Sequence, residues 1–290
     1  MLHGSLTALV TPFKNGAVDE AAFAALIEHQ IEAGTHGLVP AGTTGETPTL
    51  TREERLRVVE LCVEVSAGRV PVVAGVGVNA TAATIELQDH AKRVGADAGL
   101  VVAPYYNKPS QDGVAAHFQA VAEAVALPIV VYNVPGRTIT DIAPETLARI
   151  AEHPNIVAVK DATGEVERVT IHRNLIGDGF IQLSGEDASA LGYNAHGGHG
   201  AISVTSNVAP KLCARFQDAC RTGDWKTARR LNDQLTPLHQ ALFAAPSPGP
   251  SKYALSLLGL CEPEVRLPLL EIPDAAKAQV RAAMEGCGLL

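Results

Sequence analysis

Eight short apolar runs recur along the first 205 residues, and longer stretches with helical spacing of apolar residues separate them. The runs are SLTALV (5–10), GLVPA (37–41), PVVAGV (71–76), GLVVAP (99–104), PIVVYN (128–133), IVAVKD (156–161), FIQLSG (180–185) and AISVT (201–205). They are continuously apolar rather than alternating, which is typical of parallel strands covered on both faces. Eight strand–helix units in roughly 220 residues predict an α/β protein with a (β/α)8 TIM barrel. A doubly wound sheet is the alternative architecture.

The stretches between the runs carry helix signals. Phe23 and Leu26 lie at helical spacing in the first of them, and Thr51 with Glu54 predicts a capping box at the start of the second. After residue 220 no further strand pattern occurs. Three helical stretches follow, namely DWKTARRLNDQLTPLHQALF, SKYALSLLGL and DAAKAQVRAAMEG, and the turn-rich segment APSPGPS interrupts them. We therefore expect a catalytic barrel over residues 1–224 and a helical appendage over 225–290.

Composition excludes several classes of partner. The chain has 290 residues, 47% of them hydrophobic, and a formal net charge of −8 without any basic run. We therefore expect binding neither to nucleic acid nor to an anionic membrane surface. No apolar run approaches the ~20 residues of a membrane span, and no signal peptide is expected. Five scattered cysteines favour reduced thiols in the cytoplasm over disulfides or a zinc site.

Polar side chains gather where the predicted strands end. In a TIM barrel the active site lies at the C-terminal ends of the strands. The residues expected there are Gly42, Thr43, Thr44, Gly45, Glu46, Tyr105, Tyr106, Tyr132, Asn133, Arg137, Lys160 and Asp161. Three of the five tyrosines of the chain belong to this set, so we expect the set to form the active site.

Lys160 ends the apolar strand IVAVKD. Burial among strand ends disfavours the charged ammonium, and a neutral amine can attack a carbonyl to form a Schiff base. The alternative is a lysine that pairs with a nearby carboxylate or reaches solvent. Tyr132 ends the neighbouring strand, where a phenol could move protons for Schiff-base chemistry. Its alternative role is an aromatic cap on the core.

Three glycine-rich motifs give weaker signals. GTTGET (42–47) could bind a carboxylate or phosphate through backbone N–H groups, or could be a simple strand-to-helix turn. GVGVNA (75–80) matches a dinucleotide fingerprint, but no acidic residue clearly ends the next strand to hold a ribose. HGGHG (196–200) has two histidines and no third or fourth ligand for a metal. We therefore expect neither a nucleotide nor a metal cofactor.

Five segments together resemble the dihydrodipicolinate (4-hydroxy-tetrahydrodipicolinate) synthase family. They are GTTGE, PYYNKPSQ, YNVPGRT, VKDATG and GGHGAISVTSN, and the resemblance covers nearly the whole chain in order. This family belongs to the pyruvate-dependent class I aldolases and lyases. The resemblance implies condensation of pyruvate with aspartate 4-semialdehyde in diaminopimelate and lysine biosynthesis. The chain departs from the commoner family pattern at Ala41 and Thr47, and again in SPGPSK (247–252).

The resemblance also implies a role for each site residue. Lys160 matches the Schiff-base lysine and Tyr132 the general acid/base, while Thr43 and Tyr106 match the other members of a proton relay. Among the groups that bind substrate, Thr44 matches a contact to the pyruvate carboxylate, and Gly185 and Ile202 match backbone groups near the pocket. Arg137 matches the arginine that binds the semialdehyde carboxylate. The family is usually a homotetramer, built as a dimer of dimers, in which the Tyr106 equivalent comes from the neighbouring subunit.

Two alternatives to this function stay open. One is another pyruvate aldolase that acts on a sugar acid, and Arg137 argues against it because such relatives lack this arginine. The other is an inert relative that serves as a binding or structural oligomer.

In lysine-inhibited relatives, free lysine binds at the dimer interface. The matching positions here are Thr47, Pro48, Arg52, Arg55, Asn79, Ala83 and Tyr105. Ala83 replaces a glutamate that pairs with an effector ammonium, and Arg52 and Arg55 replace histidines. The resemblance therefore implies weak inhibition by lysine. An alternative is that the two arginines only decorate the exposed face of their helix.

Overall fold

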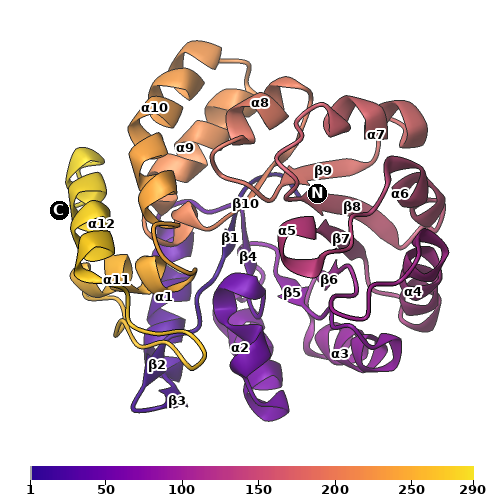
Figure 1. The fold of residues 1–290 in the computed structure, drawn as a ribbon, viewed down its shortest axis with the longest axis horizontal. Helices are drawn as coiled ribbons and strands as arrows, with labels where there is room; N and C mark the ends of the chain where they lie inside the picture. Colours follow the sequence, from indigo (N-terminus) through magenta and orange to yellow (C-terminus); the bar gives the residue numbers. More distant parts are fainter. Residues whose placement is uncertain (1) are drawn as a thin grey trace.

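Eight parallel strands form the centre of the computed structural model, which describes residues 2–290. Figure 1 shows them at the middle of the molecule, with helices around them. The strands are β1 (Gly4–Ala8), β4 (Gly37–Val39), β5 (Val73–Gly75), β6 (Ala98–Val102), β7 (Ile129–Asn133), β8 (Ile156–Asp161), β9 (Ile181–Ser184) and β10 (Gly200–Ser203). A separate hairpin consists of β2 (Phe13–Lys14) and β3 (Ala17–Val18).

The sheet closes on itself. Its order is β4-β1-β10-β9-β8-β7-β6-β5, and a parallel bridge between Leu38 and Val72 joins the two ends. Each of the eight predicted strands is present within two residues of its predicted ends. The predicted TIM barrel is therefore confirmed, and the doubly wound alternative is wrong because such a sheet has two open edges.

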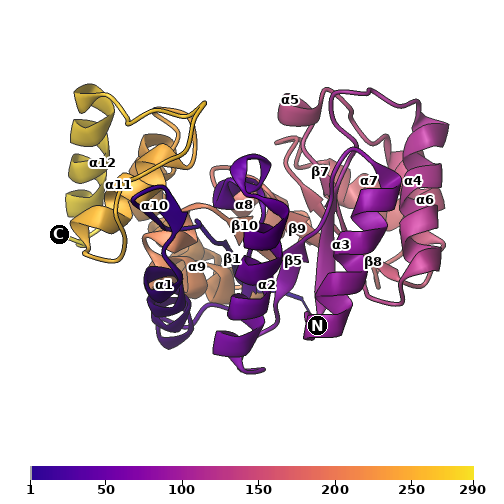
Figure 2. The same cartoon turned by 90° about the horizontal axis from the view of Figure 1, so that it is seen from below.

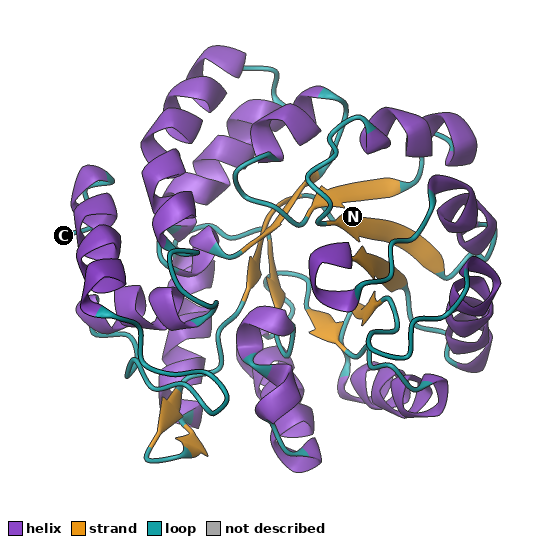
Figure 3. Ribbon diagram, in the orientation of Figure 1, coloured by secondary structure: helices purple, strands orange, loops and turns teal. Residues whose placement is uncertain are grey.

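Helices form the outer layer of the barrel, as Figure 3 shows. They are α1 (Glu20–Glu32), α2 (Arg52–Ser66), α3 (Thr81–Val94), α4 (Gln111–Ala124), α6 (Pro144–Ala151), α7 (Arg168–Ile176), α8 (Ala190–Ala195) and α9 (Pro210–Arg221). The single-turn helix α5 (Pro135–Thr138) lies over one end of the barrel instead, as Figure 1 and Figure 2 show. The predicted capping box is present in α2: Glu54 N–H donates to the Thr51 hydroxyl, and Thr51 N–H donates to the Glu54 carboxylate. No helix among residues 2–290 is long and apolar enough to cross a membrane.

The C-terminal region is helical, as predicted. It consists of α10 (Trp225–Ala241), α11 (Gly249–Leu257) and α12 (Asp274–Gly286). In Figure 2 these helices stand at one side of the barrel, where α10 packs on α9 and α12 packs on α10 and α11. One boundary was predicted wrongly: α11 already begins at Gly249, inside the segment taken as a turn. Pro250 is accommodated there because the first turn of a helix needs no N–H donor from it.

The interior of the barrel is a packed apolar cluster. Leu6, Val39, Val73, Leu100 and Val130 belong to it, together with Ala158, Leu183 and Ile202. Since side chains alternate between the two faces of a strand, residues two positions further along a strand face the same interior. This alternation decides which of the side chains at the strand ends enter the barrel.

Candidate active site

Because side chains alternate along a strand, those of Lys160 and Tyr132 point toward the interior of the barrel. Lys160 lies two residues after Ala158 on β8, and Tyr132 lies two residues after Val130 on β7, so both share the inward face. Asp161 consequently faces the outer helices, where its carboxylate accepts hydrogen bonds from the Thr163 backbone N–H (2.9 Å) and hydroxyl (2.6 Å).

Lys160 and Tyr132 are in direct contact. They are register partners on adjacent strands, and the Lys160 Nζ atom lies 4.1 Å from the centroid of the Tyr132 ring. Each residue is only 6% exposed. No carboxylate among residues 2–290 lies within ion-pair distance of Lys160, although the half-buried Glu186 carboxylate interacts with the lysine charge from further away. The alternative of a salt-bridged or solvent-reaching lysine is therefore wrong, and the amine is buried beside a phenol.

Gly185 leaves the space that the Lys160 stem occupies. It follows β9 directly, and a Cβ atom at this position would lie 3.1 Å from Lys160 Cε and 2.7 Å from the Ala162 Cβ. Ile202 on β10 is 1% exposed and belongs to the same interior cluster as Tyr132. Both predicted pocket residues thus lie at the interior of the barrel, and Gly185 borders the lysine itself.

The segment after β4 carries Thr43 and Thr44 on a short 3-10 turn, η1 (Thr43–Gly45). Non-glycine residues in the left-handed region flank this turn, Ala41 at φ 53° and Glu46 at φ 53°. Such a conformation costs about 1–2 kcal/mol per residue, so surrounding contacts must impose it. The Thr47 hydroxyl supplies two of these contacts, at 2.5 Å from the Ala41 carbonyl oxygen and 2.7 Å from that of Gly42.

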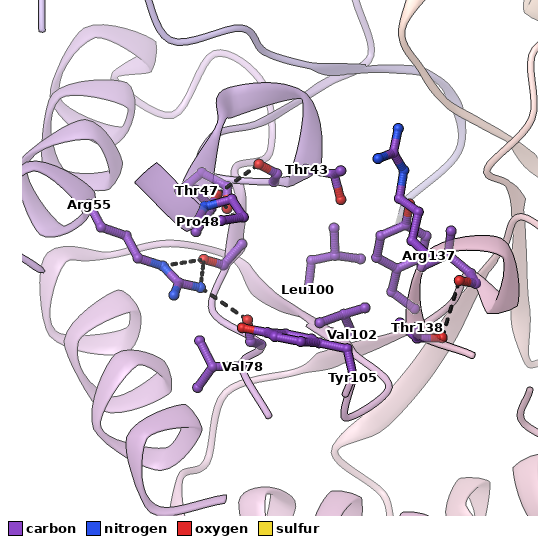
Figure 4. A pocket seen from close by; sticks show the side chains of 16 residues that line it. Thr43, Thr47, Pro48, Arg55, Val78, Leu100, Val102, Tyr105, Arg137 and Thr138 are labelled. Atoms are coloured by element: carbon purple, nitrogen blue, oxygen red, sulfur yellow. Dashed lines mark hydrogen bonds between the residues drawn. The ribbon is translucent and has the colours of Figure 1, made fainter. Parts of the chain in front are cut away.

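A cavity of about 420 Å³ opens above the strand ends. It is lined by Ala41, Gly42, Thr43, Thr47, Pro48, Arg55, Gly75, Gly77, Val78, Leu100, Val102, Tyr105, Tyr132, Val134, Arg137 and Thr138. Thr43, Tyr132 and Arg137 therefore face one cavity, whereas Lys160 and Thr44 lie outside its lining. Figure 4 shows Arg137 and Arg55 at opposite ends of the cavity, with Leu100 between them. The lining contains two arginines and no carboxylate, so the cavity favours an anionic ligand.

Arg55 was expected only at a regulatory position or on an exposed helix face. It is 8% exposed, and its guanidinium donates to the carbonyl oxygens of Gly75 (2.8 Å) and Gly77 (3.2 Å). Burial lowers the pKa of Arg55 to about 10. Arg52 does lie on the exposed face, near Glu86. The helix-face alternative is thus confirmed for Arg52 and wrong for Arg55, because the Arg55 guanidinium bends toward the barrel and binds the backbone carbonyl oxygens of Gly75 and Gly77.

Arg137 and Tyr106 are both exposed at the rim of the barrel. Arg137 is exposed on the single-turn helix α5, within the YNVPGRT segment. Tyr106 is 94% exposed and has a φ of 72°, which is rare for an aromatic residue. The Tyr106 side chain therefore does not reach the Tyr132 hydroxyl within one chain.

The glycines of GVGVNA have a packing role. A Cβ on Gly75 would lie 2.0 Å from the Ala41 carbonyl oxygen, and one on Gly77 would lie 2.3 Å from the Val102 backbone nitrogen. Close approach of neighbouring backbones, rather than a phosphate, explains these residues. In HGGHG, His199 Nδ1 accepts from Gln182 N–H, and no group of three potential metal ligands occurs among residues 2–290.

Comparison with known proteins identifies the family. The model of the Dihydrodipicolinate synthetase family matches residues 1–286. The chain belongs to this family. A relative from Hyphomonas neptunium named 4-hydroxy-tetrahydrodipicolinate synthase is 62% identical over 291 residues, covering 100% of this chain and 99% of the relative. The resemblance in the sequence motifs is therefore confirmed over the full length.

Solved structures of the family agree with the fold. The chloride-inhibited dihydrodipicolinate synthase from Acinetobacter baumannii, complexed with pyruvate, has a TM-score of 0.98 at 42% identity and full coverage of both chains. The enzyme from Cyanidioschyzon merolae, with lysine bound, has a TM-score of 0.95 at 39% identity and 99% coverage of both chains. Family membership gives the barrel and the reaction class, while the role of each residue in this chain stays a prediction.

Proposed function

We propose that this chain condenses pyruvate with L-aspartate 4-semialdehyde, through a Schiff base on Lys160, to give 4-hydroxy-tetrahydrodipicolinate. The observation that carries the mechanism is the buried Lys160 amine, unpaired by any carboxylate of residues 2–290 and in contact with Tyr132. The prediction of a lyase with this activity is confirmed by full-length relatives that carry the name of the reaction. The reaction belongs to diaminopimelate and lysine biosynthesis.

The first half of the reaction uses Lys160 and Tyr132. The Lys160 amine adds to the pyruvate carbonyl, and water leaves after protonation of the carbinolamine by the Tyr132 phenol. Loss of a methyl proton then gives the enamine. Thr43 faces the same cavity as Tyr132, which supports its proposed role in passing protons toward solvent. Buried Thr44 is proposed to bind the pyruvate carboxylate.

The second half uses the cationic rim. The enamine carbon attacks the aldehyde of the semialdehyde, and the amino group of the product then displaces Lys160 as the ring closes. Arg137 lines the cavity and can bind the semialdehyde carboxylate through a two-pronged, charge-assisted contact. Arg137 also favours this substrate over the sugar acids of the alternative function, because the related aldolases that act on sugar acids lack this arginine.

A homotetramer, built as a dimer of dimers, is part of the proposal. Tyr106 exposes 94% of its surface in one chain and has a strained backbone, which fits a side chain that inserts into a neighbour. Tyr106 would thus complete the proton relay of the partner subunit. Location in the cytoplasm is proposed as well, because all five cysteines are free and four of them are buried.

Trapping of the imine tests the function. Borohydride added with pyruvate should inactivate the enzyme, and peptide mapping should place the adduct on Lys160. Lys160→Ala should remove both the adduct and the turnover of semialdehyde, while circular dichroism shows the fold unchanged. An adduct on another lysine, or turnover without any adduct, would overturn the mechanism.

A further inference from the structure

A buried ion pair links the C-terminal helices to the loop that carries Thr43 and Thr44. Lys252 on α11 and Glu46 directly after η1 lie 2.5 Å apart, between Lys252 Nζ and Glu46 Oε1. The exposed fraction of the side chain is 0% for Lys252 and 1% for Glu46. A fully buried pair of charges is stable only when both partners are held in place.

Other contacts fix both members of the pair. Lys252 Nζ donates to the Glu264 carbonyl oxygen at 2.8 Å and lies 3.8 Å from the centroid of the Phe13 ring. Burial lowers the pKa of Lys252, and the Glu46 carboxylate opposes this shift. The second carboxylate oxygen of Glu46 accepts the backbone N–H of Arg266 at 3.0 Å. Glu46 is thus held by two residues from the region that follows α10.

Arg266 extends the link to α2. Its guanidinium forms two hydrogen bonds of 2.6 Å with the Glu54 carboxylate and one of 3.0 Å with the Thr49 carbonyl oxygen. Glu54 is also the capping-box residue of α2. The loop between β4 and α2 is therefore clamped by residues that lie more than 200 positions later in the sequence.

The clamp acts on the backbone that positions Thr43. Glu46 ends η1 in the left-handed conformation, and its N–H donates to the Thr43 carbonyl oxygen at 3.2 Å. A glutamate rarely adopts this conformation unaided, so its side-chain contacts must select it. Released from Lys252, Glu46 would lose one of the contacts that hold the turn, and the Thr43 hydroxyl would move relative to Tyr132.

We propose that Glu46, Lys252 and Arg266 are positioning residues that hold Thr43 and Thr44 in their reactive arrangement. The catalytic centre then depends on the C-terminal helices, although no side chain of those helices lines the cavity. This inference rests on the proposed function. Failure of this inference can be distinguished from failure of the proposed function, because turnover and imine trapping of the wild-type enzyme establish the function before any of these variants is measured.

Lys252→Met tests the proposal, since methionine keeps an unbranched side chain and removes the charge. Activity is expressed per active site trapped by borohydride and pyruvate, so that unfolded protein does not count. We expect trapping on Lys160 to persist and kcat per trapped site to fall about tenfold to a hundredfold, as for misplacement of a catalytic group. Leu231→Ala, in the fully buried core of α10, is the control that loses stability and keeps kcat per trapped site.

A double-mutant cycle identifies the route of the effect. If Lys252 acts through Thr43, then Thr43→Val with Lys252→Met should be no slower than Thr43→Val alone. Glu46→Gln combined with Lys252→Met is the second variant, because it removes both buried charges while an amide oxygen still accepts from Arg266. It should show the same non-additivity with Thr43→Val should Lys252→Met alone fail to fold. Unchanged kcat per trapped site in the folded variants, or rate losses that multiply with Thr43→Val, would overturn the proposal.

Discussion

Tyr132 and Lys160 are register partners on β7 and β8, and the lysine nitrogen lies 4.1 Å from the centre of the tyrosine ring. The nitrogen thus contacts the ring, while the phenol oxygen lies further along the side chain. Adjacent parallel strands fix this pair more firmly than loops could, because the sheet hydrogen bonds hold both backbones. The relationship separates two tasks that mutation can distinguish, namely covalent attachment by Lys160 and proton transfer by Tyr132.

Tyr132→Phe should keep the imine and lose turnover. The ring that packs against Lys160 remains, whereas the hydroxyl that moves protons is gone. We expect kcat to fall roughly 10²–10⁴-fold, the usual contribution of general acid–base catalysis. Steady-state assays with pyruvate and semialdehyde measure the loss. Borohydride trapping measures the imine, which should form more slowly because Tyr132 no longer protonates the carbinolamine. Near-normal turnover would assign Tyr132 to core packing alone.

Gly185→Ala should crowd the reactive lysine. The new Cβ would lie 3.1 Å from Lys160 Cε and 2.7 Å from the Ala162 Cβ, so the lysine stem and the strand end must shift. Overpacking of this kind costs about 1–3 kcal/mol of stability, and a displaced nucleophile costs up to about a hundredfold in rate. Gly179→Ala is the matched control, because nothing lies within 4 Å of its added Cβ. Equal activity of the two variants would contradict the assignment.

Arg137→Ala should impair use of the second substrate only. Loss of a charge-assisted hydrogen bond weakens binding by ~1.5–3 kcal/mol, or about ten- to a hundredfold. We expect a corresponding fall in kcat/KM for the semialdehyde, with the rate of imine trapping by pyruvate unchanged. Lys108→Ala removes a charge from another exposed position after β6 and should leave both quantities as they are. If Arg137→Ala abolished trapping instead, the arginine would belong to the pyruvate site.

Mixed oligomers should reveal that Tyr106 is shared. Tyr106→Phe and Lys160→Ala chains are each expected to be nearly inactive, for different reasons. In a hybrid dimer one site would combine an intact Lys160 with the partner's intact Tyr106. With random exchange, half of the dimers are hybrids and one of their two sites is complete, so activity should recover to about a quarter of wild type. If verified exchange produced no recovery, Tyr106 would act within its own chain.

Lysine should inhibit weakly. The half-buried Ala83 offers no carboxylate to an effector ammonium, and the Arg55 guanidinium, at another of the matching positions, adds a like charge. A lost charge-assisted contact alone weakens binding about ten- to a hundredfold. Dose–response curves should therefore show little inhibition at about 1 mM lysine. Ala83→Glu should increase the sensitivity, and strong inhibition of the unmodified chain would mean that other groups bind the ammonium.

The sequence predicts the barrel and the lysine–tyrosine pair well because both depend on local patterns. Continuous apolar runs give the strands, and strand alternation places Lys160 and Tyr132 on one face. The burial of Arg55 and the pairing of Glu46 with Lys252 were not predicted. Both depend on which segments meet in space, since Arg55 turns toward the carbonyl groups of Gly75, at the end of β5, and of Gly77. A lysine among the apolar residues of α11 is the one local sign that Lys252 is buried.

The Glu46–Lys252 contact also bears on the order in which the molecule is completed. A chain emerges from the ribosome N-terminus first, and contacts between residues distant in sequence form slowly because a long loop must close. All eight strands precede Lys252, the last of them ending at Ser203. A nascent barrel can therefore close before its Thr43 turn is anchored. We expect newly made chains to acquire the shape of the enzyme before they acquire its activity. The step between the two is the release of the C-terminal helices from the ribosome, after which Lys252 can pair with Glu46.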